Sequence, residues 1–243
     1  MLNENREKIL SLYKENALLH ERASRYISAA GSLLSDNYRI ALDATDVPKA
    51  VKFAARFAKK EFKPQNHTGT ESRRFLSGFT PSGHIFFKST VHMLANRIFV
   101  IDDTYGASSR VIMSVLRATA LENGYDIITC CCPVNPDEKI EHIIIPSLSL
   151  AFCTGNQYLT FDNVERCYHS RRFTDLQKLR RKKQRLSFNR KAVRELLQST
   201  VDILTEAKAV HDNLEKHYIN AMDFEKVEKI TIKTVSEFLA MIK

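Results

Sequence analysis

The chain has 243 residues, 44% of them hydrophobic and 27% charged, an ordinary composition for a protein that buries a core as one large or two modest domains. No uninterrupted apolar run approaches the roughly 20 residues needed to span a bilayer, and residues 1–8 lack a signal-peptide core, so we expect a cytoplasmic protein without a membrane span. The formal net charge of +9 is carried by residues 166–190, where ten Lys and Arg residues accompany one acid; this favours an anionic partner or a solvated helix face.

Residues 1–62 are predicted to form a helical hairpin. Apolar residues at helical spacing predict a first long helix over residues 9–41. Asp46 and Pro48 are typical of a helix start, and the apolar residues after them predict a second helix. Residues 63–72 are rich in polar residues and contain proline and glycine, which indicates a linker.

Residues 73–160 are predicted to form an α/β core. Strands alternate with helices along this segment, which favours a mostly parallel sheet with helices on its faces and the long terminal helices beside it. The predicted elements are a strand over 73–79, a turn over 80–83, helices over 85–94 and 111–123, strands over 96–102 and 125–130, and strand-like runs over 142–146 and 148–152.

Residues 161–243 are predicted to form a basic long helix and a second helical hairpin. The segment contains neither proline nor glycine, so it lacks the residues that most often break a helix. An apolar stripe over residues 193–218 predicts one long helix. Asp223 is a typical N-cap for a last helix over residues 224–242.

The two ends of the chain overlay on one another. Both have the order long helix, break and short helix, and their matching positions share residue types. The matches are Asp36 with Asp212, Asn37 with Asn213, Asp46 with Asp223, Lys49 with Lys226 and Lys52 with Lys229. We therefore interpret the two hairpins as a duplication.

The strand, loop, helix and strand over residues 96–130 follow the order in which P-loop NTPases place the phosphate-binding motif G-x-x-x-x-G-K-[ST]. In this chain Asp103 and Ser108 stand where the two glycines belong. Ser109 replaces the lysine, and Arg110 replaces the serine or threonine. The scaffold of the motif is retained, and its chemistry is lost.

Five residues mark this vestigial phosphate-loop position: Asp103, Gly106, Ser108, Ser109 and Arg110. A helix N-terminus presents N–H donors, so a weak site for a phosphate-like anion is expected here. The carboxylates of Asp102 and Asp103 oppose a polyphosphate unless a metal ion intervenes. We therefore expect neither ATP with Mg²⁺ nor another resident cofactor.

The five cysteines predict no metal site. Three are adjacent, Cys130, Cys131 and Cys132, and none forms a C-x-x-C pair. Adjacent residues of a strand point to opposite faces, so buried thiols in a reducing compartment are expected instead. The histidines and acids form no pattern that assigns catalytic residues.

Several segments, in order, resemble a family of P-loop proteins from spore-forming bacteria whose members are described as ATPase-like or nucleotide-kinase-like. These segments lie at 78–83, 99–114, 121–127, 131–137, 144–148, 207–218 and 221–224. The family carries two copies of one module, each ending in a helical hairpin. The resemblance implies that residues 1–62 are the hairpin of a first copy, and that the second copy is complete but has a degenerate Walker A motif. Every defining residue of that motif differs, so ATPase or kinase activity is not implied.

Three functions are open at this point. The first is a P-loop-fold protein that does not hydrolyse nucleotide and acts by binding or assembly, with its long helices forming a homo-oligomer or a protein interface. The second is a nucleic-acid-binding module whose affinity falls with salt. The third is a residual Mg²⁺-dependent ATPase or nucleotide kinase, in which Asp102 or Asp103 holds the metal ion and Arg110 supplies positive charge. The nucleic-acid contacts would come from Arg171, Arg172, Arg180, Arg181, Lys182, Lys183 and Arg185.

Overall fold

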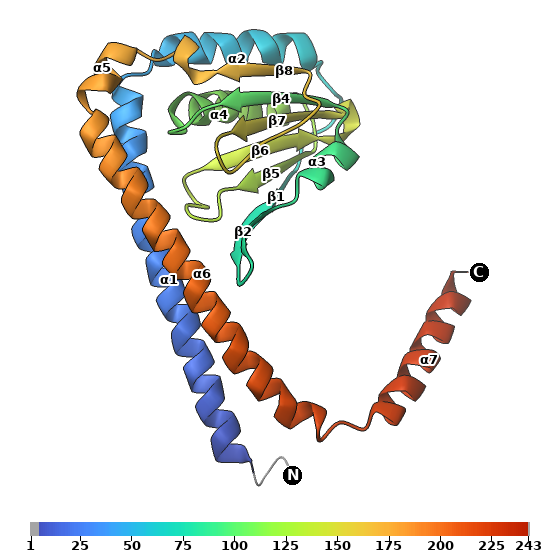
Figure 1. Cartoon of the computed structure of the whole chain (residues 1–243). Coiled ribbons are helices and arrows are strands. Elements are labelled where there is room, and N and C mark those ends of the chain that lie inside the picture. Colours follow the sequence, from blue (N-terminus) through green and yellow to red (C-terminus); the bar gives the residue numbers. More distant parts are fainter. Residues whose placement is uncertain (1–4, 243) are drawn as a thin grey trace. The chain divides into compact units, whose positions relative to one another are not determined.

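The computed structural model describes residues 5–242, so the first four residues of the predicted hairpin 1–62, and Lys243, lie outside the described residues. The chain divides into two compact units. Among the described residues, 23–202 form one unit, which contains the sheet, and 5–22 with 203–242 form the other. Figure 1 labels the elements of both units.

The sequence alternates between long helices at its ends and short elements in its middle. The helices are α1 (Arg6–Asp43), α2 (Val47–Glu61), α3 (Lys88–Leu94), α4 (Ala107–Glu122), α5 (Leu176–Arg181), α6 (Lys183–Ile219) and α7 (Phe224–Met241), with 3₁₀ turns η1 (Pro146–Leu148) and η2 (Ser170–Arg172). The strands are β1 (Glu71–Arg74), β2 (Ser77–Thr80), β3 (Gly83–Phe86), β4 (Arg97–Asp102), β5 (Ile127–Cys131), β6 (Ile140–Ile145), β7 (Leu150–Gly155) and β8 (Arg166–His169).

Six strands form the central sheet in the order β1-β5-β6-β7-β4-β8, as Figure 1 shows. The pairs β1–β5, β4–β7 and β4–β8 are parallel, whereas β6 runs antiparallel to both of its neighbours. Strands β2 and β3 form a separate hairpin. The prediction of an α/β fold with a mostly parallel sheet and long helices is confirmed.

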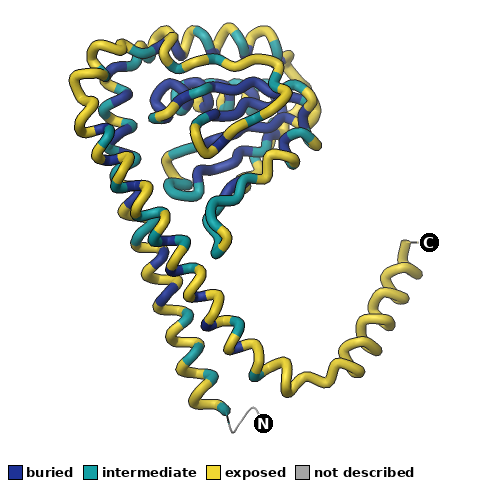
Figure 2. The backbone as a smooth tube through the Cα atoms, viewed as in Figure 1, coloured by how far each residue is buried: buried dark blue, intermediate teal, exposed yellow. Residues whose placement is uncertain are grey.

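Each face of the sheet is covered by a different layer, because alternate residues of a strand point to opposite sides. Phe99 and Ile101 of β4 point into the larger core, which α2 and α4 cover. Ile98 and Val100 point into a second core with Val91 of α3 and residues next to the β2–β3 hairpin. The central strands are accordingly the most continuously buried part of the chain (Figure 2).

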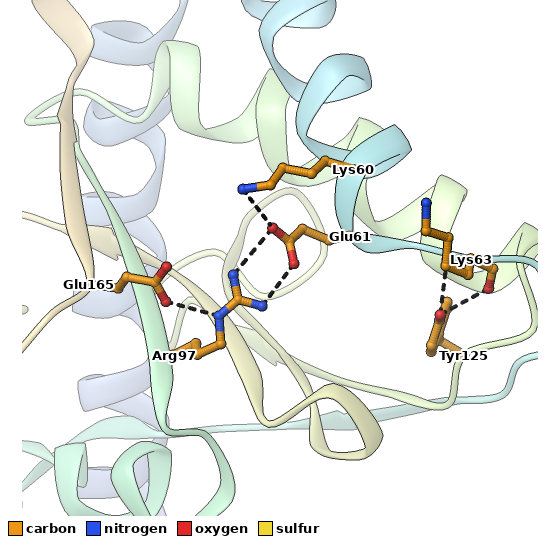
Figure 3. A network of polar contacts seen from close by, with 6 residues as sticks. All are labelled: Lys60, Glu61, Lys63, Arg97, Tyr125 and Glu165. Carbon is orange, nitrogen blue, oxygen red and sulfur yellow. Dashed lines mark hydrogen bonds and ion pairs between the residues drawn. The ribbon is translucent and has the colours of Figure 1, made fainter.

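A network of ion pairs connects the end of α2 with the amino-terminal end of β4 (Figure 3). The Arg97 guanidinium donates to both carboxylate oxygens of Glu61, at 2.8 and 3.2 Å, and to Glu165 at 3.0 Å. Glu61 is the last residue of α2, and its hydrogen bond with Arg97 holds the pKa of its carboxyl group below the ordinary value. Nearby, the Tyr125 hydroxyl accepts from the backbone N–H of Lys63 and donates to its carbonyl. These contacts position α2 over the sheet.

Several element boundaries differ from those expected. The single strand expected over residues 73–79 is two strands, β1 and β2, which belong to different sheets, and β1 begins at Glu71, inside the expected linker 63–72. Helix α4 begins at Ala107 instead of residue 111, because Gly106 adopts a left-handed conformation with φ of 74° and turns the chain early. Residues 85–86 belong to β3, whose positive-φ Gly83 closes a hairpin in place of a helix start. The basic segment contains a strand, β8, before any helix, because it pairs in parallel with β4 at the edge of the sheet.

The second unit contains the start of α1, the end of α6 and all of α7. The Asn16 amide donates to the Ala207 carbonyl of α6 at 2.8 Å. Helix α7 begins as predicted after Asp223, whose carboxylate accepts from the Lys226 N–H at 3.1 Å. Figure 2 shows α7 exposed along its length.

No helix among residues 5–242 combines the length and the apolar character that crossing a lipid bilayer requires.

Candidate functional site

A cleft of about 380 Å³ lies within the unit formed by residues 23–202. Its walls include the segments that follow the carboxyl ends of β4, β5 and β7, which is where open α/β sheets bind ligands. Residues of α1, α6 and the β2–β3 hairpin complete it. The residues that line the cleft include Asn37, Phe79, Tyr105, Arg110, Lys139, Glu141, Tyr158, Arg190, Val193, Arg194 and Leu197.

The turn after β4 is organised by the carboxylate of Asp103, which is 4% exposed. One carboxylate oxygen accepts from the backbone N–H groups of Tyr105 and Gly106, at 3.2 and 3.0 Å. The other accepts from the Ser108 hydroxyl at 2.9 Å and from the Ser109 N–H at 2.8 Å. The first turn of α4 therefore already holds an anion, and that anion is part of the chain.

The hydrogen bonds of Asp103 involve some of the five residues predicted to form a phosphate-loop position and leave others out. Asp103 and Ser108 are hydrogen-bonded to each other, and the Ser109 N–H is used by Asp103. Ser108, Ser109 and Arg110 were expected in a loop but lie inside α4, because the helix begins at Ala107. The donors that the sequence assigned to a phosphate-like anion at this helix end are thus largely occupied.

The other side of Gly106 is lined by two cationic side chains. A Cβ atom at Gly106 would lie 3.5 Å from Lys139 Cε and 3.8 Å from Arg110 Nε, with the Ser109 hydroxyl at 3.9 Å. Glycine is needed here because φ is 74°, a conformation that strains other residues. The absence of a side chain also leaves the space into which Lys139 and Arg110 both reach.

Arg110 is fixed in place but incompletely hydrogen-bonded. Its guanidinium lies over the Tyr38 ring, 4.0 Å from the centroid, and one terminal nitrogen is 3.6 Å from a Glu138 carboxylate oxygen. The side chain is 11% exposed, and its Nε has no hydrogen-bond partner within the described part of the chain. A buried donor without a partner costs on the order of 1–3 kcal/mol, so Arg110 Nε is a position at which a ligand oxygen would be favoured.

Asn37 of α1 supplies a second such donor. Asn37 is 2% exposed, and its side-chain oxygen accepts a hydrogen bond from the Asn189 amide at 3.0 Å. Its own amide nitrogen has no partner among residues 5–242. Asn37 lines the cleft together with Arg110.

Lys139 and Glu141 form a buried ion pair in the same cleft, with 2.8 Å between Nζ and the carboxylate. Burial by itself would lower the pKa of Lys139, but the Glu141 carboxylate outweighs it, and the pKa is raised. Burial would likewise raise the pKa of Glu141, but Lys139 outweighs it, and the pKa is lowered. Both groups are therefore charged at neutral pH.

Asp102, a suggested metal ligand, is paired with His169. Asp102 and His169 are register partners on β4 and β8, and a carboxylate oxygen lies 2.8 Å from His169 Nδ1. Both side chains are about half exposed. Residues 5–242 contain no group of three or more His, Cys, Asp or Glu side chains arranged to hold a metal ion.

The residues of the predicted basic cluster are not among those that line the cleft. The members of the cluster are all exposed and are Arg171, Arg172, Arg180, Arg181, Lys182, Lys183 and Arg185. They are distributed over η2, α5 and the start of α6 instead of one long helix face. Arg172 lies over the Phe53 ring at 5.5 Å, and Arg185 pairs with Asp36 at 3.0 Å.

The cysteines are free. Cys130, Cys131 and Cys132 are buried, as expected, and so is Cys153, whereas Cys167 is exposed. Burial raises the pKa of the Cys130 thiol to about 12, so at neutral pH it is a poor nucleophile.

Sequence reasoning missed most of the cleft. Asn37 was noted only as a matching position of the duplication, and Arg190 only as the last residue of the basic segment. Lys139 and Arg194 were not singled out. One signal was present: Arg190, Val193, Arg194 and Leu197 are spaced as one face of a helix, and Val193 and Leu197 were part of the predicted apolar stripe.

Comparisons with protein-family models, with curated proteins and with solved structures found no match to this chain.

Proposed function

We propose that this chain is a protein of P-loop NTPase type that does not hydrolyse nucleotide and acts as a ligand-binding protein. The observation that carries the proposal is the position of the Asp103 carboxylate, which takes the N–H groups of Gly106 and Ser109 and the hydroxyl of Ser108. In a functional phosphate loop such donors bind the phosphates, and a lysine neutralises their charge. Here an internal carboxylate holds the donors, and Ser109 stands at the lysine position.

The cleft supports a binding role because it is preformed. Its volume of about 380 Å³ falls within the range of small-molecule sites. Its polar groups are held by neighbours, as the pairs Lys139–Glu141 and Arg110–Tyr38 show. Groups held in this way lose little conformational freedom when a ligand binds.

The decisive experiment measures phosphate release from ATP and GTP with and without Mg²⁺, together with the melting temperature in the presence of the same nucleotides. We expect no Mg²⁺-dependent release, and no nucleotide shift larger than that given by sulfate or inorganic phosphate. The matched variant is Asp103→Asn, which keeps the side-chain shape and removes the charge.

Mg²⁺-dependent turnover by the wild-type chain that Asp103→Asn abolishes would contradict the proposal. It would identify Asp103 as part of a working nucleotide site. Turnover that appears only in the Asp103→Asn variant would support the proposal, because the Asp103 carboxylate would then be the group that excludes phosphate.

Assembly through α7 is a second element of the proposed function, favoured by the exposure of its apolar residues. Val227 is 43% exposed, Val235 50% and Phe238 62%. These residues share one helix face, whereas Lys229 and Lys233 occupy the opposite face. We propose that two copies of the chain associate by packing these faces against each other, because a self-complementary patch generates a symmetric dimer.

A further inference from the structure

Two residues that line the cleft each have a buried side-chain donor without a partner among residues 5–242: Arg110, through Nε, and Asn37, through its amide nitrogen. The Ser109 hydroxyl is also without a partner in the described chain and lies beside Gly106 with Lys139 and Arg110, although Ser109 is not one of the residues that line the cleft. A ligand with acceptor oxygens can satisfy such donors, whereas an apolar ligand satisfies none of them.

The charge of the cleft selects an anion. The Glu141 carboxylate is neutralised by Lys139 at 2.8 Å, which leaves Arg110 with the exposed side chains of Arg190 and Arg194 from α6. The opposing charge nearest to Arg110 is Glu138, at 3.6 Å and 54% exposed. An exposed pair at that distance is weak, so it leaves Arg110 available to a buried anionic group.

Apolar side chains line another part of the cleft. Val193 and Leu197 of α6 face it, together with Phe79 of β2 and Tyr158 from the segment after β7. Val193 is buried and Leu197 half-buried, so these side chains form a fixed wall. A ligand that only supplied an anionic head, such as inorganic phosphate, would leave this wall without a partner.

We propose that the cleft binds a small amphiphilic organic anion, with its phosphate or carboxylate head at Arg110 and Asn37 and its apolar or aromatic tail against Val193 and Leu197. This inference rests on the proposed binding function and names the chemical class of its ligand. The head group is separate from the donors that Asp103 occupies at the start of α4.

Titration calorimetry of the full chain with matched compounds tests the proposal. Phenyl phosphate and 4-phenylbutyrate carry both head and tail. Inorganic phosphate and acetate carry the head alone, and 4-phenylbutanol carries the tail alone. We expect the two amphiphilic anions to bind at least about tenfold more tightly than either half, because head and tail contacts add within one site. The preferred head is identified by comparing 4-phenylbutyrate with 4-phenylbutyl phosphate, which differ in the head and share a phenylalkyl tail.

Two variants locate the head. Arg110→Leu removes the guanidinium, and Asn37→Asp keeps the oxygen that accepts from Asn189 while replacing the unpartnered donor by a carboxylate oxygen. Each is expected to weaken the amphiphilic anions about tenfold or more and to leave 4-phenylbutanol unchanged. Arg181→Leu, which removes an exposed arginine of α5, is the matched control and should bind as the wild type does.

The proposal is overturned if no amphiphilic anion binds, if inorganic phosphate binds as well as phenyl phosphate, or if Arg181→Leu weakens binding as much as Arg110→Leu. Unchanged binding by Asn37→Asp also overturns it, and that variant decides the matter if Arg110→Leu does not fold. Mg²⁺-dependent nucleotide hydrolysis in the same preparations would instead count against the proposed function and leave an Arg110-dependent anion site intact.

Discussion

The imidazole of His142 is enclosed in the second core of the sheet. The residue is 1% exposed, its ring stacks on Phe86 with 5.6 Å between centroids, and Phe161 meets its edge at 5.7 Å. Neither ring nitrogen has a hydrogen-bond partner within the described chain. Burial lowers the pKa of His142 to about 4, and the nearby Glu141 only partly opposes this effect.

Acidification should therefore destabilise the protein through His142. Its pKa is about 4 in the folded chain and 6.5 when unperturbed, so the unfolded chain binds the proton more readily between these values. The stability that depends on a neutral His142 is fully present above pH 6.5, and it is lost as the pH falls from 6.5 toward 4. We expect this residue alone to lower the free energy of unfolding by about 2 kcal/mol between pH 7 and pH 5, as measured by urea denaturation.

His142→Leu should remove most of this loss, because leucine has a similar volume and no proton to gain. A smaller dependence of the free energy of unfolding on pH should persist in this variant, because burial also lowers the pKa of His84. His20→Gln, which replaces an exposed histidine, is the matched control variant. An identical loss of stability in His142→Leu and the wild type would contradict the assignment.

Asp103 shows how much of a site a single residue can predict. That a carboxylate at the first glycine position opposes phosphate follows from its charge. That the carboxylate turns back onto Gly106, Ser108 and Ser109 does not, because it depends on the left-handed conformation of Gly106 and the early start of α4. The negative charge at this position was thus readable from the sequence, whereas the internal hydrogen-bond network that the carboxylate forms was not.

At the scale of elements, α2 and α7 begin in the same way and differ in their surroundings. Asp46 accepts from the Lys49 N–H at 3.0 Å, and Asp223 accepts from the Lys226 N–H at 3.1 Å. This agreement supports the proposed duplication. The apolar face of α2 is buried against α4 and the sheet through Ala54 and its neighbours, whereas the corresponding face of α7 is exposed.

We therefore expect the apolar face of α7 to determine the oligomeric state. Replacing Val235 and Phe238 by Asp should convert a dimer into a monomer, because two buried charges at a helix interface are costly. Light scattering coupled to size exclusion measures the mass directly. The paired control replaces Lys229 and Lys233 by Ser and should remain dimeric; a monomeric wild-type chain would refute the assembly proposal.

Strand β8 was missed because its sequence favours no strand by itself. Its side chains are mostly exposed, and two of its four residues are arginine and histidine. What makes it a strand is the free edge of β4, with which residues 166–169 pair in register, from Arg166 opposite Phe99 to His169 opposite Asp102. Such tertiary pairing outweighs local propensity at sheet edges.

At the scale of the whole molecule, the positive charge is concentrated on exposed residues. Nucleic-acid binding therefore stays a second candidate function, and its signature is a dependence on salt. Replacing Arg180, Arg181 and Lys182 by Gln should reduce the slope of log affinity against log salt by about 3 units if each contacts one phosphate. Fluorescence anisotropy with a labelled duplex measures this slope. The control variant replaces Lys52 and Lys59 of α2 by Gln. If both variants have the same slope of log affinity against log salt, a role for the basic cluster is contradicted.

The class of the fold was predictable because strand and helix periods alternate clearly between residues 96 and 130. The cleft was not, because its walls come from α1, from the segments after three strands and from α6. Asn37 and Arg110 are adjacent to the same space only once the sheet has formed. Periodicity describes each element separately and carries no information on which faces meet.

The order of strands in the sheet also has a consequence for how the chain reaches its native state. Strands β5, β6 and β7 follow one another in sequence and pair as neighbours, with Ile128 opposite Ile144 and His142 opposite Cys153. The parallel pairs join distant residues, such as Glu71 with Ile127 and Phe99 with Arg166. Closing short loops loses less chain entropy than closing long ones. The antiparallel meander of β5, β6 and β7 is therefore expected to form early in folding, and β1, β4 and β8 to dock onto it afterwards.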